Sequence, residues 1–345
     1  MSINCSFSIP VSDVYFSEIL LWEKIAVGIC VAMCLGVLGL FIDKAYFFIS
    51  HYHTSNPQIK IKCLWLVGIY PIFAVAALLA IFVPRAALLC DLVSSVYLAV
   101  CLVHFNSLII LYSGGAQKLL EKVKNTGFNL RTPPCCCCCF CCPTIDATGT
   151  NLKKMQLMVL QTSFLQPFIS FVTIVLWLDE KYIVGEISFM KPYLYLAIAN
   201  AVSTLVAMYG LLVLFQSVRI FLKRHSIAQK FMVLQLVLIF HNLQGFIFET
   251  LAKKNIPSSN GCLSSTVRSK ALQHMILVAE MFLLAFMARI LYRKPHTEEF
   301  DLENDDSDLD KSLLSTDNGW RRTQGPAREG YERLPGHSFE EHKTS

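Results

Sequence analysis

The chain has 345 residues, of which 54% are hydrophobic and 16% are charged, with a formal net charge of +5. In soluble proteins about a quarter of all residues are charged, so this composition excludes an ordinary soluble enzyme or nucleic-acid-binding protein. The first residues lack the basic stretch of a cleavable signal peptide, and we expect the first apolar run to start membrane insertion itself.

Long apolar runs follow one another along the chain, and a run of about 18 residues suffices to cross a bilayer as a helix. They predict an all-α polytopic membrane protein with seven transmembrane helices. The expected spans are 25–48, 63–83, 86–112, 155–178, 192–218, 231–248 and 272–292. Pro71 and Pro167 fall inside two of them, where each removes a backbone hydrogen bond and is expected to bend the helix.

The distribution of Lys and Arg predicts the orientation. These residues are about twice as frequent in the loops after the first, third and fifth spans and after the last span as on the opposite side. Basic loops stay in the cytosol, so we expect the N-terminus outside and the C-terminus inside. Asn4 begins an Asn-Cys-Ser glycosylation sequon on the side predicted to be outside. The expected organisation is an extracellular segment 1–24, a membrane domain 25–294 with a cytosolic loop 113–154, and a tail 295–345.

Seven of the fourteen cysteines gather in the loop predicted to follow the third span. They are Cys135, Cys136, Cys137, Cys138, Cys139, Cys141 and Cys142. Cytosolic thiols stay reduced, so disulfides are not expected there. Adjacent cysteines without a nearby histidine also fit a zinc site poorly, because zinc ligands come as spaced pairs. Beside a membrane the run favours S-acylation, with fatty chains holding the loop to the inner leaflet, over unmodified thiols.

Ionisable residues at membrane depth are costly and point to function. The candidates for a substrate pathway are His104, His241, Glu280, Gln235, Asn106 and, near the two membrane faces, Arg85 and Arg289. Asp91 is a further membrane-depth carboxylate. Helix-to-helix hydrogen bonding is the alternative role for the amides, and snorkelling is the alternative for the two arginines.

The tail from His296 onward holds 13 acidic and 6 basic residues with few large apolar ones, which is typical of disorder. It contains a dileucine pattern at Asp310, Leu313 and Leu314, and a tyrosine pattern at Tyr331 and Leu334. These patterns permit binding of sorting adaptors, and a merely solvating tail is the alternative.

Several blocks resemble the alpha subunit of the organic solute transporter. The most distinctive is Pro133-Pro134 with the cysteine run and Pro143, followed by Lys153-Lys154-Met155. Further agreements, over about residues 23–295, are Pro84-Arg85, Gly114-Gly115, Lys230-Phe231, His274, Glu280 and Arg289.

The resemblance implies seven spans with the N-terminus outside and an obligate complex with a single-span beta subunit. It implies facilitated, sodium-independent transport of amphipathic anions, such as bile acids and conjugated steroids, at the basolateral plasma membrane. It also maps acylation onto the seven cysteines of the run. No metal and no cofactor are implied beyond the fatty acyl chains, and the partners are the beta subunit, the substrates and membrane lipids. A paralogue that modulates trafficking or signalling without transport is the alternative.

Other seven-span classes fit less well. A G-protein-coupled receptor would carry Asp-Arg-Tyr at the end of the third helix, where Tyr112-Ser-Gly-Gly stands. A seven-span zinc hydrolase would need a His-x-x-x-His pair, which this sequence does not have. We therefore expect a transporter and no enzymatic activity.

Overall fold

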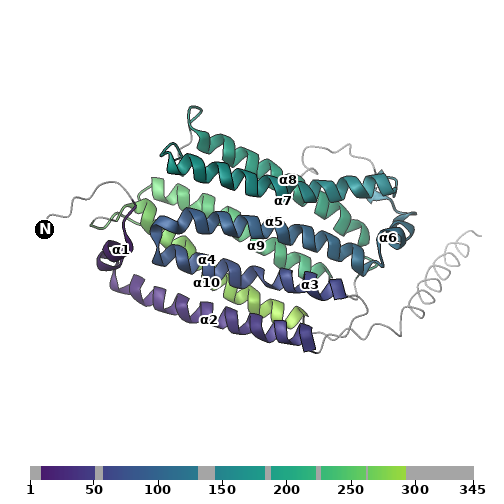
Figure 1. Cartoon of the computed structure of the whole chain (residues 1–345), viewed down its shortest axis with the longest axis horizontal. Helices are drawn as coiled ribbons and strands as arrows, with labels where there is room; N and C mark the ends of the chain where they lie inside the picture. Colours follow the sequence, from purple (N-terminus) through teal and green to yellow (C-terminus); the bar gives the residue numbers. More distant parts are fainter. Residues whose placement is uncertain are drawn as a thin grey trace, which may run out of the picture. The chain divides into compact units, whose positions relative to one another are not determined.

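The computed structural model describes residues 9–50, 57–130, 144–182, 188–222, 227–261 and 263–292. These residues contain seven helical segments long and apolar enough to cross a membrane, which confirms the predicted all-α polytopic fold (Figure 1). The helices are α1 (Ser12–Glu18), α2 (Leu21–Ser50), α3 (Pro57–Val67), α4 (Ile69–Phe82), α5 (Ala87–Tyr112), α6 (Ala116–Val123), α7 (Gly149–Leu178), α8 (Pro192–Val218), α9 (Ile227–Lys253) and α10 (Ser265–Tyr292). A 3-10 turn, η1 (Pro84–Ala86), precedes α5, and two short strands, β1 (Phe128–Asn129) and β2 (Thr144–Ile145), lie between α6 and α7.

The second span consists of two helices, α3 and α4, that are interrupted at Gly68. Pro71 has no N–H, so it cannot bond to the carbonyl of Val67, and the helix breaks beside that residue. Hydrogen bonds from Gly68 to Leu64 (2.9 Å) and from Ile72 to Gly68 (3.3 Å) keep the two halves in register. By contrast, α7 runs without a break through Pro167.

Successive spans run back and forth, so their ends gather in two groups (Figure 1). We call them the α1 end, where α2, α5, α8 and α10 begin, and the α6 end, where α2, α5, α8 and α10 finish. Gly114 and Gly115 turn the chain from α5 into α6 with φ angles of 85° and 101°, a region that favours glycine. The helices α7 and α8 pack on each other and on α5, while α10 lies against α2, α4 and α9.

The outward faces of these helices are apolar. Large exposed side chains include Leu35, Phe164, Phe168, Phe171, Phe246 and Leu283. Apolar surface of this extent is unfavourable in water and favourable in lipid. Each Å² of apolar surface that is removed from water lowers the free energy by about 25 cal/mol. Polar side chains such as Thr162, Gln166 and Ser170 are instead buried inside.

A small hairpin fixes the ends of the cysteine-rich loop. Strands β1 and β2 pair antiparallel, with Phe128 opposite Ile145. Phe128 is fully buried, and the Tyr209 hydroxyl of α8 donates to the carbonyl of Leu130 at 3.1 Å. The loop therefore leaves and rejoins the described structure at one place beside α8. The seven cysteines of the run lie outside the described residues, as do Asn4 and the tail residues Asp310, Leu313, Leu314, Tyr331 and Leu334.

Candidate functional site

A cavity of about 300 Å³ lies at the α1 end, bounded by α5, α7, α8, α9 and α10. Its walls are largely apolar, with Leu88, Leu92, Ile169, Trp177, Leu196 and Ala197 among the lining residues. This volume is at the lower limit for pockets that bind small molecules. It accommodates a head group and the part of a ligand next to it.

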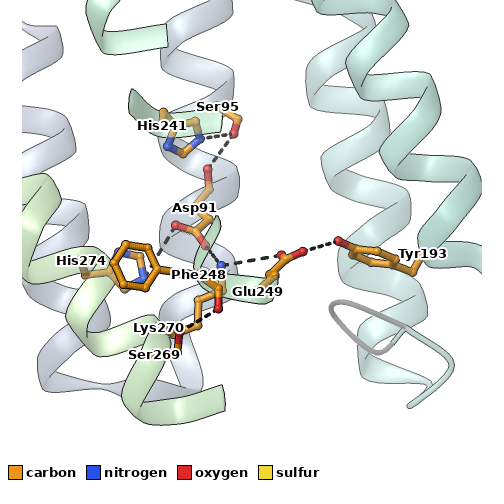
Figure 2. A network of polar contacts seen from close by, with 9 residues as sticks. All are labelled: Asp91, Ser95, Tyr193, His241, Phe248, Glu249, Ser269, Lys270 and His274. Atoms are coloured by element: carbon orange, nitrogen blue, oxygen red, sulfur yellow. Dashed lines mark hydrogen bonds and ion pairs between the residues drawn. The ribbon is translucent and has the colours of Figure 1, made fainter. Parts of the chain in front are cut away.

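A network of charged side chains lines the cavity (Figure 2). The ammonium of Lys270 on α10 lies 3.7 Å from an oxygen of Asp91 on α5 and 4.0 Å from an oxygen of Glu249 on α9. The Tyr193 hydroxyl of α8 donates to the other oxygen of Glu249 at 2.7 Å. The network thus connects four helices across the cavity.

Two histidines extend the network towards the middle of the bundle. His274 Nε2 lies 3.9 Å from Asp91 Oδ1, and neither ring nitrogen of His274 has a hydrogen-bond partner among the described residues. The Ser95 hydroxyl donates to the carbonyl of Asp91 at 2.9 Å, and His241 Nε2 lies 3.0 Å from the same hydroxyl oxygen. Since the Ser95 proton is already used, His241 donates from Nε2 and its unpartnered Nδ1 is the acceptor.

A second, smaller space of about 20 Å³ continues the first one deeper into the bundle. Ser95, Gln166 and Asn200 line both spaces, and His241 lines the deeper one. The amide oxygen of Asn200 and the hydroxyl of Thr162 lie at the same place, and no described residue forms a hydrogen bond with either. The polar lining therefore reaches beyond the charged network.

Arg85 and Tyr182 also line the cavity, and the exposed Arg85 side chain marks its mouth. Burial, with a smaller effect of the nearby carboxylates Glu249 and Asp91, raises the pKa of the Tyr182 hydroxyl to about 12. Tyr182 is therefore a neutral hydrogen-bond donor at physiological pH. Arg85 donates from Nε to the carbonyl of Ile9 at 3.0 Å, so this contact does not neutralise its charge.

The structure brings only two of the seven sequence-predicted pathway residues to this site, namely Arg85 and His241. Glu280 accepts a hydrogen bond from Gln244 at 2.5 Å, away from the cavity lining. The ring of His104 lies over Trp65, with 5.2 Å between ring centroids.

The remaining predicted residues are also placed elsewhere. Arg289 pairs with Asp43 at 3.2 Å at the α6 end. In the described part of the chain, the side chains of Asn106 and Gln235 each have one buried atom without a hydrogen-bond partner. A role of these residues in the pathway remains a prediction.

Sequence reasoning missed Lys270, Glu249, Tyr193 and His274 as site residues. The predicted sixth span ended at residue 248 and the seventh began at 272, whereas α9 continues to Lys253 and α10 begins at Ser265. Lys270 and Glu249 were therefore assigned to a loop. The membrane-depth position of Asp91 was the one available signal, because an intramembrane carboxylate requires a cationic or hydrogen-bonding partner.

The sequence matches a known protein family over most of its length. The family model described as Organic solute transporter Ostalpha matches residues 26–298. The chain belongs to this family. It is 27% identical over 313 residues to the organic solute transporter subunit alpha of Danio rerio, covering 91% of this chain and 94% of that protein.

More distant relatives extend the comparison. The Homo sapiens organic solute transporter subunit alpha is 27% identical over 272 residues, covering 79% of each chain. A Dictyostelium discoideum protein named Transmembrane protein 184 homolog is 27% identical over 231 residues, which are 64% of this chain and 45% of that protein. No solved structure matches the chain. The resemblance inferred from the cysteine block is thus confirmed at the level of the family.

Proposed function

We propose that this chain is the alpha subunit of a facilitative transporter of amphipathic organic anions, with bile acids and conjugated steroids as the substrate class. It works with a single-span beta subunit and without sodium coupling, at the basolateral plasma membrane. Membership of the Ostalpha family and the names of the relatives support the transport function.

The observation that carries the proposal is the cavity at the α1 end. It combines an apolar wall with two cationic side chains, Lys270 and Arg85. An amphipathic anion needs both, because its body gains from apolar contact while its acidic group needs a positive partner. Since the cavity holds only part of such a ligand, the rest of the apolar body lies against the apolar helix faces.

With the proposed orientation, the α1 end faces the outside of the cell. The α6 end, with its basic loops and the cysteine-rich loop, faces the cytosol. Acyl chains on Cys135–Cys139, Cys141 and Cys142 then enter the inner leaflet, because β1 and β2 hold both ends of that loop beside α8. A mass shift sensitive to hydroxylamine, lost when the seven residues are changed to Ser, tests this modification.

The test of function is the flux of a labelled steroid sulfate into cells that express the chain with and without a beta subunit. We expect flux only with both subunits, in either direction down the gradient, and independent of sodium. Flux of small hydrophilic ions at the same rate would contradict the proposed substrate class. Absence of flux in every pairing would favour a paralogue that modulates trafficking or signalling.

The matched variants are Lys270→Gln, at the cavity, and Lys154→Gln, on the exposed face of α7. Hydrogen bonds to charged groups contribute about 1.5–3 kcal/mol, so Lys270→Gln should weaken apparent affinity about tenfold or more. Lys154→Gln should leave the affinity unchanged. Equal kinetics of the two variants would exclude Lys270 from anion binding.

A further inference from the structure

The charges around Lys270 do not balance. Two carboxylates, Asp91 and Glu249, lie within 4.0 Å of this single ammonium. The other cation of the cavity, Arg85, bonds through Nε to a neutral carbonyl at the mouth. An acidic ligand group that approaches Lys270 therefore meets one carboxylate more than the lysine can neutralise.

Both ion pairs are also longer than a charged hydrogen bond, which is about 2.7–2.9 Å between nitrogen and oxygen. The distances of 3.7 Å and 4.0 Å show that Lys270 shares its charge without closing tightly on either carboxylate. Among the described residues, the Glu249 carboxylate accepts a short hydrogen bond from Tyr193, at 2.7 Å, and Asp91 accepts none of that length at its carboxylate. The arrangement leaves carboxylate oxygens available to a second donor.

The buried polar groups beside the carboxylates also favour a ligand that donates hydrogen bonds. His274 is 1% exposed, lines the cavity and is turned towards Asp91 (Figure 2), and within the described part of the chain both its ring nitrogens are without a hydrogen-bond partner. The amide oxygen of Asn200, a further acceptor, is also unpartnered. A neutral imidazole has one donor and one acceptor nitrogen, so this part of the lining contains two acceptors, one on His274 and one on Asn200, that the described residues do not fill.

We infer that the cavity selects amphiphiles whose head group carries a protonated amine next to its acidic group. The ligand amine bonds to Glu249 and Asp91, and the ligand acid bonds to Lys270 and, at the mouth, to Arg85. Each charge of the ligand replaces part of an internal pairing, so no charge in the cavity is left uncompensated. This inference rests on the proposed transport function and adds to its substrate class a preference for zwitterionic head groups.

The neighbouring aromatic residues fit this assignment. Tyr182 and Tyr193 have ring centroids 5.5 Å apart, and both line the cavity with Trp177. Aromatic faces attract cations, most strongly where water is excluded. An amine bound to Glu249 lies beside Tyr193, since its hydroxyl is 2.7 Å from that carboxylate.

The test uses the full-length chain co-expressed with a beta subunit in membranes, and three probes that share one steroid body. One probe ends in a sulfonate, one in a protonated secondary amine with a sulfonate, and one in the amine alone. We expect the zwitterionic probe to displace a labelled steroid sulfonate at about tenfold lower concentration than the unlabelled sulfonate probe. Equal or weaker binding of the zwitterionic probe to the unmodified protein would overturn the inference.

Variants of Glu249 test whether this carboxylate binds the ligand amine. Glu249→Gln should abolish the preference for the zwitterionic probe while keeping binding of the sulfonate probe, and Glu249→Asp should restore part of the preference. Glu121→Gln, the same change on the exposed face of α6, should leave the preference as it is. A preference that survives in Glu249→Gln would refute the role of this carboxylate.

The outcome also separates the inference from the proposed function. If the sulfonate probe is transported but the zwitterionic probe binds no more tightly, the inference is wrong and the transporter stands. If none of the probes is transported, the proposed function is wrong, and the ranking of binding affinities still decides the inference. Should Glu249→Gln fail to fold, the ranking on the unmodified protein is sufficient.

Discussion

Arg268 at the start of α10 forms a buried ion pair with Glu23 at the start of α2, with 2.8 Å between Nη2 and Oε1. The two residues are 245 positions apart, and their side chains are 5% and 8% exposed. Arg268 also donates to the carbonyl of Ser258, and the backbone N–H of Leu20 donates to Glu23 at 2.9 Å. The pair therefore joins the first and last spans at the α1 end.

Loss of Arg268 should destabilise the bundle strongly. Arg268→Gln leaves the Glu23 carboxylate buried without a counter-charge, and removal of one partner of a buried pair costs about 3–5 kcal/mol. We expect a large fall in the midpoint of thermal unfolding of the purified protein. The double variant Glu23→Gln with Arg268→Gln should recover part of the stability. A single variant as stable as the unmodified protein would show that the pair contributes nothing.

The close contact of α7 and α8 depends on Gly210. A Cβ atom at this position would lie 2.9 Å from Met158 Cβ and 3.0 Å from the carbonyl oxygen of Met155. Gly210→Ala should therefore lower the free energy of unfolding by about 1–3 kcal/mol, because the helices must separate. At Gly39 in α2 nothing lies within 4 Å, so Gly39→Ala should be neutral or stabilising by up to about 1 kcal/mol. Thermal unfolding of both variants checks the sign, and equal effects would contradict this account of the α7–α8 contact.

Tyr193 holds Glu249 in position across the cavity, and the neighbouring Tyr195 offers a matched control. Tyr193→Phe removes the 2.7 Å hydrogen bond to the carboxylate, which should weaken ligand affinity several-fold with little change in the maximal rate. Tyr195 is exposed and bonds only to the carbonyl of Phe189 among the contacts described, so Tyr195→Phe should leave transport kinetics unchanged. Concentration-dependent flux distinguishes the two, and identical curves would remove Tyr193 from the site.

Alkaline pH should weaken the fold through Tyr15 of α1. Its pKa is raised from 10.0 to about 12, mainly by burial and also by the Glu23 carboxylate, while Arg268 acts in the opposite direction. Below pH 10 the phenol is protonated in both states and has no effect. Between pH 10 and 12 the unfolded chain releases the proton first, so the free energy of unfolding falls as the pH rises.

Tyr15→Phe should reduce that loss of stability. The unfolding midpoint of the variant and of the unmodified protein, measured from pH 8 to 11.5, gives the two slopes. At pH 8 neither state is ionised, so any difference there reports the lost hydroxyl alone. Parallel slopes above pH 10 would mean that Tyr15 does not contribute.

The seven spans were predictable because a bilayer requires about 20 apolar residues for each crossing. Runs of this length can be recognised in the sequence without knowledge of the tertiary structure. The same reasoning gave inexact ends. Lys270 lies in the second turn of α10 and Glu249 near the end of α9, where charged residues interrupt the apolar run although the helix continues. For that reason these two residues were not predicted to belong to the site.

The sequence alone determined the class of the protein, the number of spans and, through the cysteine block, the family. Only the tertiary structure determined the site. Helices that are apolar on every side carry little signal for which face turns inward, because lipid and protein interior are equally apolar. The meeting of Asp91, Glu249, Lys270 and Tyr193 depends on how four helices pack and rotate, and no local pattern of residues records that arrangement.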